Sequence, residues 1–362
     1  MKTSFVAVRK ANPATIGRDY RRLLTEAQLL DHLGKHRPII LKLNLSWTRF
    51  FPACSSPPWQ LDHTVGFLKE GCVTAHDLIP VENKTVVTNP LLGAENNRWD
   101  KVFTKQGLNF VPLPNVKWVK FKPKAQLLAL HRIFPDGIEI PEIFLDKPII
   151  HFPTMKTHGH SITTGAVKNS FGGLLKEVRH YCHKHMHEVL VDLMLLQREI
   201  HPRVFAVMDA TTAGNGAGPR TMEPRDTGLI LASPDSVAVD AVAAKLMGFN
   251  PLDIPYLRMC HEMNLGVADM SRIELVGDDV ADLNLGFTTK RSFVIWGDQM
   301  LRKGPLRFLE KILLHSKAVG WAPMASNIYH DYIWYPLVGA RHIKQFNSGR
   351  WGALFAEYGN SS

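Results

Sequence analysis

Short apolar runs alternate with longer amphipathic segments along most of the chain. Segments with apolar residues at helical spacing cover 26–35, 59–70, 97–106, part of 166–198, and 236–247. Runs of the length and composition of buried strands cover 5–8, 39–43, 85–88, 109–111, 149–152, 204–208, 228–231, 273–276 and 293–295. Alternation of this kind predicts an α/β fold with a mainly parallel sheet.

Changes in this pattern along the 362 residues predict three parts. Pro and Lys become frequent between 114 and 150, which suggests a seam between two α/β lobes, 1–125 and 126–285, with a cleft between them. After about residue 286 the chain becomes basic and aromatic, and 304–321 reads as an amphipathic helix with a basic face. We therefore expect a basic helical extension over 286–362.

The helix predicted at 236–247 has clear boundary signals. Ser233 reads as its N-cap, Pro234 as its first residue, and Asp235 lies near the positive end of the helix dipole. Gly248 is a suitable residue to end it.

The positive charge of the chain is concentrated in the predicted extension. The net charge is +10, and residues 290–362 hold ten Lys or Arg against four Asp or Glu. The excess indicates an anionic partner for this segment, either a membrane surface or an acidic redox protein. A solvated basic face is the alternative. We expect no nucleic-acid partner, because no nucleic-acid-binding signature accompanies the charge.

Cysteine spacing and hydropathy exclude several classes of protein. The four cysteines are far apart and form no CxxC pair, which argues against a ferredoxin module, a zinc ribbon or a disulfide framework. No apolar run reaches the roughly 18–20 residues of a membrane span, and the N-terminus lacks the apolar core of a signal peptide. The expected location is cytoplasmic, with peripheral attachment to a membrane left open.

The densest group of chemically useful side chains lies between His151 and His187, which holds seven histidines. Lys156, His158 and His160 follow a predicted strand and would point to one side, at the sheet edge where α/β proteins bind ligands. Imidazoles there can transfer protons or bind a metal. The alternative is a polar loop with unremarkable histidines.

The second half of this stretch offers an anion site and a metal site. Lys168 and Asn169 stand at a glycine-flanked helix start, where backbone amides favour anions; a surface lysine is the alternative. His183 and His187 are four residues apart, on one helical face, which is metal-ligand spacing. A solvated polar face would show the same pattern.

Other candidate residues lie further along the chain. Asp209 and Asn215 belong to the segment MDATTAGNGAGPR, which reads either as a loop that contacts phosphate or substrate, or as a plain turn. Asp240 is surrounded by small apolar residues, so its carboxylate must anchor a site residue or bind backbone amides. Lys42 and Asn44 would share one face at a strand end.

Several of these motifs, in order, resemble one family, the uncharacterised domain-of-unknown-function family 362. The resemblance covers roughly Val6 to Gly277, and many members of that family carry ferredoxin-type cysteine motifs that this chain lacks. The motifs are Lys42-x-Asn44, MKTH at 155–158, TGAVKNSFG at 164–172, the histidines with Asp192, MDATTAGNGAGP at 208–219, the segment 229–249, IPYL at 254–257 and IELVG at 273–277.

A fainter similarity is to the nickel-pincer lactate racemases, because nine residues separate His158 from Lys168 and further histidines follow about fifteen residues later. This resemblance implies a cofactor-bearing Lys168, a proton-transferring His158 and a metal-binding His183 or His185. The Gly-Gly pair stands after Lys168 here, whereas in that family it precedes the lysine.

Two functions follow from these patterns. The first is an enzyme that transfers a proton or hydride on a small carboxylate with the help of nickel, iron, zinc or a pincer cofactor. The second is a non-catalytic accessory protein that binds a small anionic ligand and docks on a membrane or redox partner. The predicted site residues are His158, Lys168 and Asp240 for catalysis, Lys42, Asn44, Lys156, Asn169, Asp209 and Asn215 for ligand or cofactor binding, and His160, His183 and His187 for metal.

Overall fold

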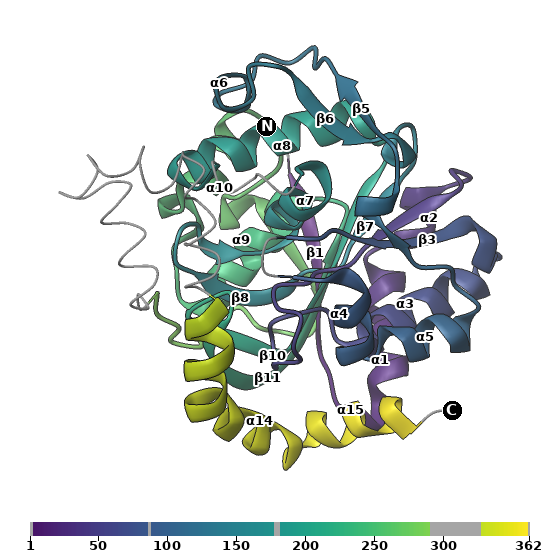
Figure 1. Ribbon diagram of the computed structural model, residues 1–362, viewed down its shortest axis with the longest axis vertical. Helices are drawn as coiled ribbons and strands as arrows, with labels where there is room; N and C mark the ends of the chain where they lie inside the picture. Colours follow the sequence, from purple (N-terminus) through teal and green to yellow (C-terminus); the bar gives the residue numbers. More distant parts are fainter. Residues whose placement is uncertain (1–2, 86–87, 177–181, 290–326, 361–362) are drawn as a thin grey trace.

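A ten-stranded, mostly parallel sheet runs through the computed structural model, which describes residues 3–85, 88–176, 182–289 and 327–360 (Figure 1). The α/β prediction is confirmed. The β1–β11, β10–β11 and β8–β9 pairs are antiparallel. The strand order is β12 (Ile273–Gly277), β1 (Ser4–Lys10), β11 (Thr221–Ser233), β10 (Val204–Ala217), β7 (Ile149–His151), β2 (Ile39–Lys42), β3 (Leu78–Glu82) and β4 (Val111–Pro112), with β8 (Thr154–His158) paired to β10 and to β9 (Ile162–Thr164).

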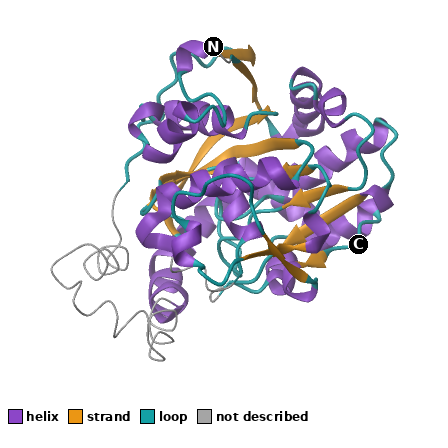
Figure 2. Cartoon of the chain, turned by 90° about the horizontal axis from the view of Figure 1, so that it is seen from above, coloured by secondary structure: helices purple, strands orange, loops and turns teal. Residues whose placement is uncertain are grey.

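Helices cover both faces of this sheet (Figure 2). Successive strand residues alternate between two cores: Ile149 belongs to one and Ile150 to the other. On the first face lie α7 (Ala166–Leu174), α8 (Met186–Ile200), α9 (Ser236–Met247) and α10 (Pro255–Glu262). On the second face lie α1 (Ile16–Glu26), α2 (Leu29–Leu33), α3 (Pro58–Glu70), α4 (Pro90–Asn96), α5 (Trp99–Gln106) and α15 (Arg350–Asn360).

Strands from both predicted lobes belong to the one sheet, since β2 of the first lobe pairs with β7 of the second. The division into lobes with a cleft stays a prediction. A small antiparallel pair, β5 (Trp118–Phe121) with β6 (Ile138–Pro141), and the short α6 (Leu130–Ile133) lie near the predicted seam.

Several predicted elements were wrong in position. Of the strand expected at 85–88, residues 86–87 lie outside the described residues, and Thr85 and Thr88 form an isolated bridge. The strand in this region is β3, whose Pro80 interrupts the apolar run. The helix expected at 26–35 is divided between α1 and α2, and the long helix expected within 166–198 is divided between α7 and α8. The predicted strand at 293–295 and amphipathic helix at 304–321 lie outside the described residues.

Of the predicted boundaries of α9, the C-terminal one is correct and the N-terminal one is two residues too early. Asp235, and not Ser233, is the N-cap, because its side chain accepts hydrogen bonds from the amides of Val237 (3.0 Å) and Ala238 (3.1 Å). Gly248 ends the helix at φ +101°, as predicted.

The chain ends in a helical segment, composed of the π-helix η10 (Ile328–Gly339), α14 (Ala340–Asn347) and α15. The last helix is part of the second core. Trp351 is only 2% exposed and stacks on Trp59 with 5.5 Å between ring centroids, and the Tyr358 hydroxyl donates to Asp62 at 2.8 Å. None of the helices in the described ranges is both long and apolar enough to span a bilayer.

Candidate functional site

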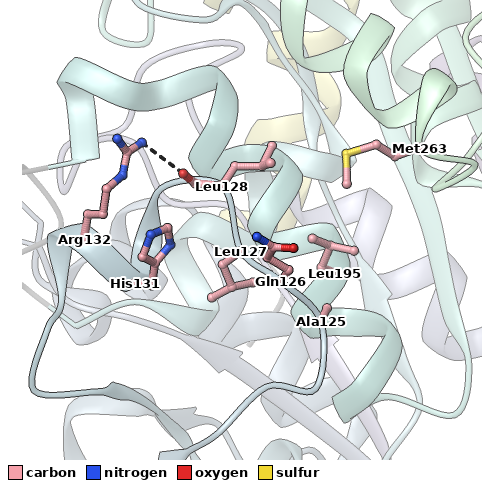
Figure 3. A pocket seen from close by; sticks show the side chains of 8 residues that line it. All are labelled: Ala125, Gln126, Leu127, Leu128, His131, Arg132, Leu195 and Met263. Carbon is pink, nitrogen blue, oxygen red and sulfur yellow. Dashed lines mark hydrogen bonds between the residues drawn. The ribbon is translucent and has the colours of Figure 1, made fainter.

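A pocket of about 720 Å³ is lined by three parts of the chain (Figure 3). These are helix α6 with the segment before it, helix α8, and the residue that follows α10. The pocket is lined by apolar side chains with Gln126, His131 and Arg132, and it contains none of the predicted site residues. The site must therefore be sought from the topology of the sheet.

The sheet changes winding direction between β2 and β7. From β2 the chain moves outward to β3 and β4, whereas from β7 it reaches β10 on the other side. The carboxyl ends of β2 and β7 lie side by side, with Lys42 opposite His151. Such a switch point is where open α/β sheets bind ligands.

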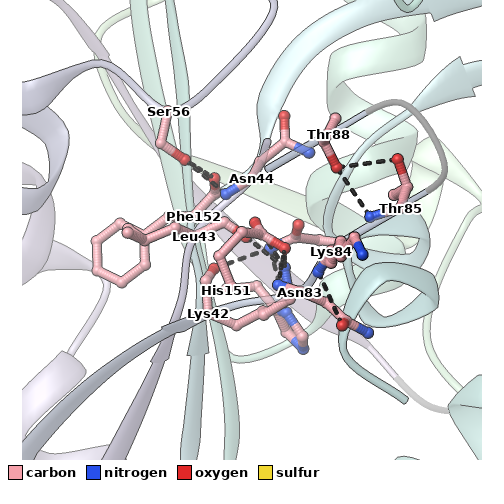
Figure 4. A network of polar contacts seen from close by, with 12 residues as sticks. Lys42, Leu43, Asn44, Ser56, Asn83, Lys84, Thr85, Thr88, His151 and Phe152 are labelled. Atoms are coloured by element: carbon pink, nitrogen blue, oxygen red, sulfur yellow. Dashed lines mark hydrogen bonds and ion pairs between the residues drawn. The ribbon is translucent and has the colours of Figure 1, made fainter. Parts of the chain in front are cut away.

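Lys42 forms a buried ion pair at this point (Figure 4). Its Nζ donates to both carboxylate oxygens of Glu82, at 2.8 and 2.9 Å, and to the carbonyl of Leu43 at 2.6 Å. Both side chains are no more than 3% exposed. Glu82 was missed in the sequence because its strand was predicted several residues too late.

Lys156 and Asn44, both predicted to bind a ligand or cofactor, contact each other beside this pair. Lys156 Nζ donates to Asn44 Oδ1 (2.7 Å), to the carbonyl of Cys54 (2.7 Å) and to the Thr154 hydroxyl (2.6 Å). Burial lowers the pKa of Lys156 to about 8. The amine is thus a buried cation held by neutral oxygens.

Helix α7 closes over the end of β2. Asn169 Nδ2 donates to the carbonyl of Lys42 at 2.9 Å. A Cβ on Gly172 would lie 3.3 Å from Lys42 Nζ, and one on Gly173 would lie 3.3 Å from Lys42 Cε. Because Gly172 and Gly173, the glycine pair after Lys168, have no side chains, helix α7 can lie close to Lys42.

His158 lies at the end of β8, in a group of basic side chains that we call the histidine–lysine centre: His158, His160, His183 and Lys168. The His160 ring lies 5.8 Å from the His158 ring and 4.9 Å from that of His183. Burial, and then the charge of Lys168, hold the pKa of His158 well below its usual range. His158 is therefore neutral at physiological pH.

The hydrogen bonds of His158 define which nitrogen carries its proton. Nδ1 accepts from the backbone amides of His160 (3.1 Å) and Ser161 (3.3 Å). In a neutral imidazole the other nitrogen, Nε2, must then carry the proton. His158 is a neutral donor, which fits it to bind an anionic oxygen rather than to remove a proton.

Asp240 caps the helix that carries Lys168. Its Oδ1 accepts from the amide of Ala166 (2.6 Å), and its Oδ2 from that of Val167 (3.1 Å) and from the Tyr256 hydroxyl (3.3 Å). Burial raises the pKa of Asp240 to about 7. Of the two roles left open by the sequence, the structure shows the backbone-bonded one, and this carboxylate occupies the place where the sequence predicted an anionic ligand.

The contacts given for three other predicted residues are with residues outside the histidine–lysine centre. Asp209 faces the second core, where it accepts from Tyr20 (2.9 Å) and Trp59 (3.0 Å), and burial raises its pKa to about 6. Asn215 Oδ1 accepts from the amide of Thr288 at 2.8 Å. His187 stacks on a tyrosine of α10.

The loop predicted over 208–220 is wrong for residues 208–217, because these residues belong to β10. Gly214 and Gly218 allow neighbouring parts of the chain to pack closely. A Cβ on Gly214 would lie 2.5 Å from Met222 Sδ, and one on Gly218 would lie 2.0 Å from the carbonyl of Thr157. This segment shows no phosphate-loop geometry.

Within the described ranges, no three His, Cys, Asp or Glu side chains are grouped so as to hold a metal ion. His183 precedes α8, which begins at Met186, so His183 and His187 do not share one α-helical face. His180 lies outside the described residues. Metal binding stays a prediction.

The sequence model of one family, described as a domain of unknown function (DUF362), matches residues 39–245, which is more than half of the chain. The chain belongs to this family. The match begins at β2 and ends within α9, so it includes the switch point and the histidine–lysine centre of this DUF362 chain.

The DUF362 chain also shares partial similarity with two other proteins. It is 29% identical over 124 residues to a thylakoid-associated protein of Synechocystis sp., a match that covers 32% of this chain and 37% of that protein. A crystal structure of a protein from Thermotoga maritima aligns with a TM-score of 0.36 at 12% identity, covering 57% of this chain and 52% of that one.

Proposed function

We propose that this DUF362 protein binds a small carboxylate at the histidine–lysine centre. The observation that carries the proposal is that Nδ1 of His158 accepts hydrogen bonds from two backbone amides, which leaves Nε2 as the nitrogen that carries the proton of the neutral ring. Among the charged groups, Lys168 has the largest effect on the pKa of His158. A hydrogen bond to an anionic oxygen, made beside a cation and out of bulk water, is stronger than a neutral one.

The proposed chemistry is proton transfer on the bound carboxylate, with a division of roles. His158 would hold the anionic oxygen, and Lys168 would balance its charge. His158 cannot be the base, because its Nδ1 lone pair is used by backbone amides. The proposed base is therefore one of two other described imidazoles. The His160 ring lies next to that of His158, and the His183 ring lies next to that of His160.

Calorimetric titration of the full chain with oxalate, lactate and inorganic phosphate tests the binding claim. We expect His158→Phe to weaken oxalate binding at least tenfold and His158→Gln, which keeps an N–H donor, to weaken it less. Lys168→Met should weaken binding and reduce its salt dependence. Lys245→Met, a half-buried lysine on α9, is the matched control and should bind as the parent does. Equal affinity in all four variants would reject the proposal.

A non-catalytic binding protein is the second candidate. It is favoured by one observation: the charged and titratable groups with the largest effects on the pKa of His158 are Lys168, His160, His183 and Lys156, which are all basic. Exchange of the lactate α-proton in D₂O, followed by NMR with and without added nickel, iron or zinc, separates the two. Binding without exchange would identify the chain as a ligand-binding protein.

A further inference from the structure

The helix η10 exposes a stripe of large apolar side chains. Tyr332 is 71% exposed and Leu337 74% exposed, and three further apolar residues of the same helix are also exposed. We call the set the outer apolar stripe; its members are Ile328, Tyr332, Ile333, Leu337 and Val338.

The opposite side of η10 is firmly attached to the molecule, so this exposure does not come from a loosely placed helix. The indole of Trp47 donates to Asp331 at 2.6 Å, and the Tyr335 hydroxyl donates to the carbonyl of Phe50 at 3.2 Å. Trp334 packs on the Phe51 ring at 5.3 Å. Figure 1 shows the yellow C-terminal helices along the outside of the core.

Exposed basic side chains lie next to the stripe. Arg341 and Lys344 of α14 are exposed, as is Arg49, which lies over the Tyr335 ring. Asp331 is the one acid among residues 327–349, and it points toward Trp47. In sequence, the preceding residues 290–326 hold seven Lys or Arg and two Asp or Glu.

We propose that the outer apolar stripe, together with Arg341 and Lys344, docks on an anionic lipid surface. An interfacial helix buries its apolar side chains among the lipid headgroups and acyl-chain ends, while flanking Lys and Arg bind lipid phosphate and carboxylate groups. Tyr332 suits this position because its ring is apolar and its hydroxyl stays in the wet headgroup layer.

A second copy of the chain fits this face less well. In a two-fold dimer the same patch meets itself. Of the carboxylates near the stripe, Asp331 accepts from Trp47 and Glu223 is paired with Arg225, so both already have partners within the same copy. A surface rich in anionic headgroups supplies the complement to the exposed basic side chains.

Vesicle co-sedimentation of the full chain tests the proposal. With phosphatidylcholine vesicles that contain 30% phosphatidylserine, the parent protein should bind, and binding should fall at least tenfold on pure phosphatidylcholine or in 0.5 M salt. Tyr332→Ser with Leu337→Ser should lose binding on both kinds of vesicle. Arg341→Ser with Lys344→Ser should lose mainly the phosphatidylserine-dependent part.

Two matched controls change residues outside the stripe. One is Met263→Ser, at an exposed methionine that lines the pocket of Figure 3, and the other is Lys120→Ser with Lys122→Ser. Both should bind as the parent does, and unchanged melting temperatures and oxalate affinity would show that all variants are folded. The proposal is overturned if the parent does not bind vesicles, or if the stripe variants bind as well as the parent. It is also overturned if the parent is a dimer without vesicle affinity and the stripe variant is a monomer, since a second copy would then cover the stripe.

Discussion

Asp240 accepts a hydrogen bond of 2.6 Å from the backbone amide of Ala166, which lies 74 residues earlier in the chain. The anion bound at the start of α7 is therefore a side chain of the protein itself. Lys168 is the third residue of this helix. We therefore expect Asp240 to act as a positioning residue for the histidine–lysine centre.

The titration of Asp240 should appear in the pH dependence of stability. Its folded-state pKa of about 7 lies above the roughly 3.9 of an unfolded aspartate, so the folded state holds the proton more tightly. Between about pH 4 and pH 7 the free energy of unfolding must therefore fall as pH rises, by at most about 1.4 kcal/mol per pH unit from this group.

Urea unfolding at pH 4.5 and pH 7.5 measures this dependence. Asp240→Asn should lose less stability over that interval than the parent does. Asp209, whose raised pKa of about 6 acts in the same direction, is present in both proteins and cancels in the comparison. Equal pH dependence in the two proteins would show that Asp240 does not titrate in this range.

Gly165 should tolerate no side chain. A Cβ there would lie 1.9 Å from Asp240 Oδ1, so Gly165→Ala must displace the cap, at a cost of about 1–3 kcal/mol or more. Gly66→Ala on α3 is the control, since nothing lies within 4 Å of its Cβ, and it should be neutral or stabilise by up to about 1 kcal/mol. Chemical unfolding of both variants checks the contrast, and similar effects at the two glycines would contradict it.

The buried Lys42–Glu82 pair should be intolerant of single changes. Lys42→Met leaves the Glu82 charge buried without its partner, which should cost about 3–5 kcal/mol. The double variant with Glu82→Leu should recover part of this loss. Lys117→Met breaks an exposed pair with Glu142 and should cost less than about 1 kcal/mol. A double-mutant cycle from urea unfolding decides, and additive losses would mean that the pair does not act as a unit.

The C-terminal helix should be required for folding. Trp351→Ala removes a fully packed indole from the second core, and we expect a loss of about 3–5 kcal/mol. Tyr332→Ala, on the exposed stripe of η10, should change stability by less than about 0.5 kcal/mol. Thermal melting compares the two, and a small effect at Trp351 would show that α15 is an independent appendage.

Periodicity predicted the fold class and several elements because the buried strands and helices repeat at 2.0 and 3.6 residues. It placed α3, α9, β2 and β7 within a residue or two. It missed β3, because Pro80 interrupts an apolar run that is nevertheless paired on both sides.

The grouping of some site residues could be expected, since the carboxyl ends of adjacent parallel strands meet. These residues are Lys42, Asn44, Lys156 and Asn169. The partner of Asp240 could not be expected. Its amides belong to a helix far away in sequence, and a carboxylate among small apolar residues looks the same whether it binds a lysine or a backbone. The tautomer of His158 likewise depends on the turn at Ser161, which no spacing rule describes.

The central claim is that His158 presents a neutral Nε2–H to an anionic ligand, and long-range ¹H–¹⁵N NMR of the histidine rings tests it most directly. Assigned by comparison with His158→Gln, the His158 ring should stay in the Nε2–H form between pH 5 and 8, and its Nε2 signals should shift when oxalate is added. A ring protonated on Nδ1, an imidazolium in this pH range, or signals that ignore oxalate would contradict the account.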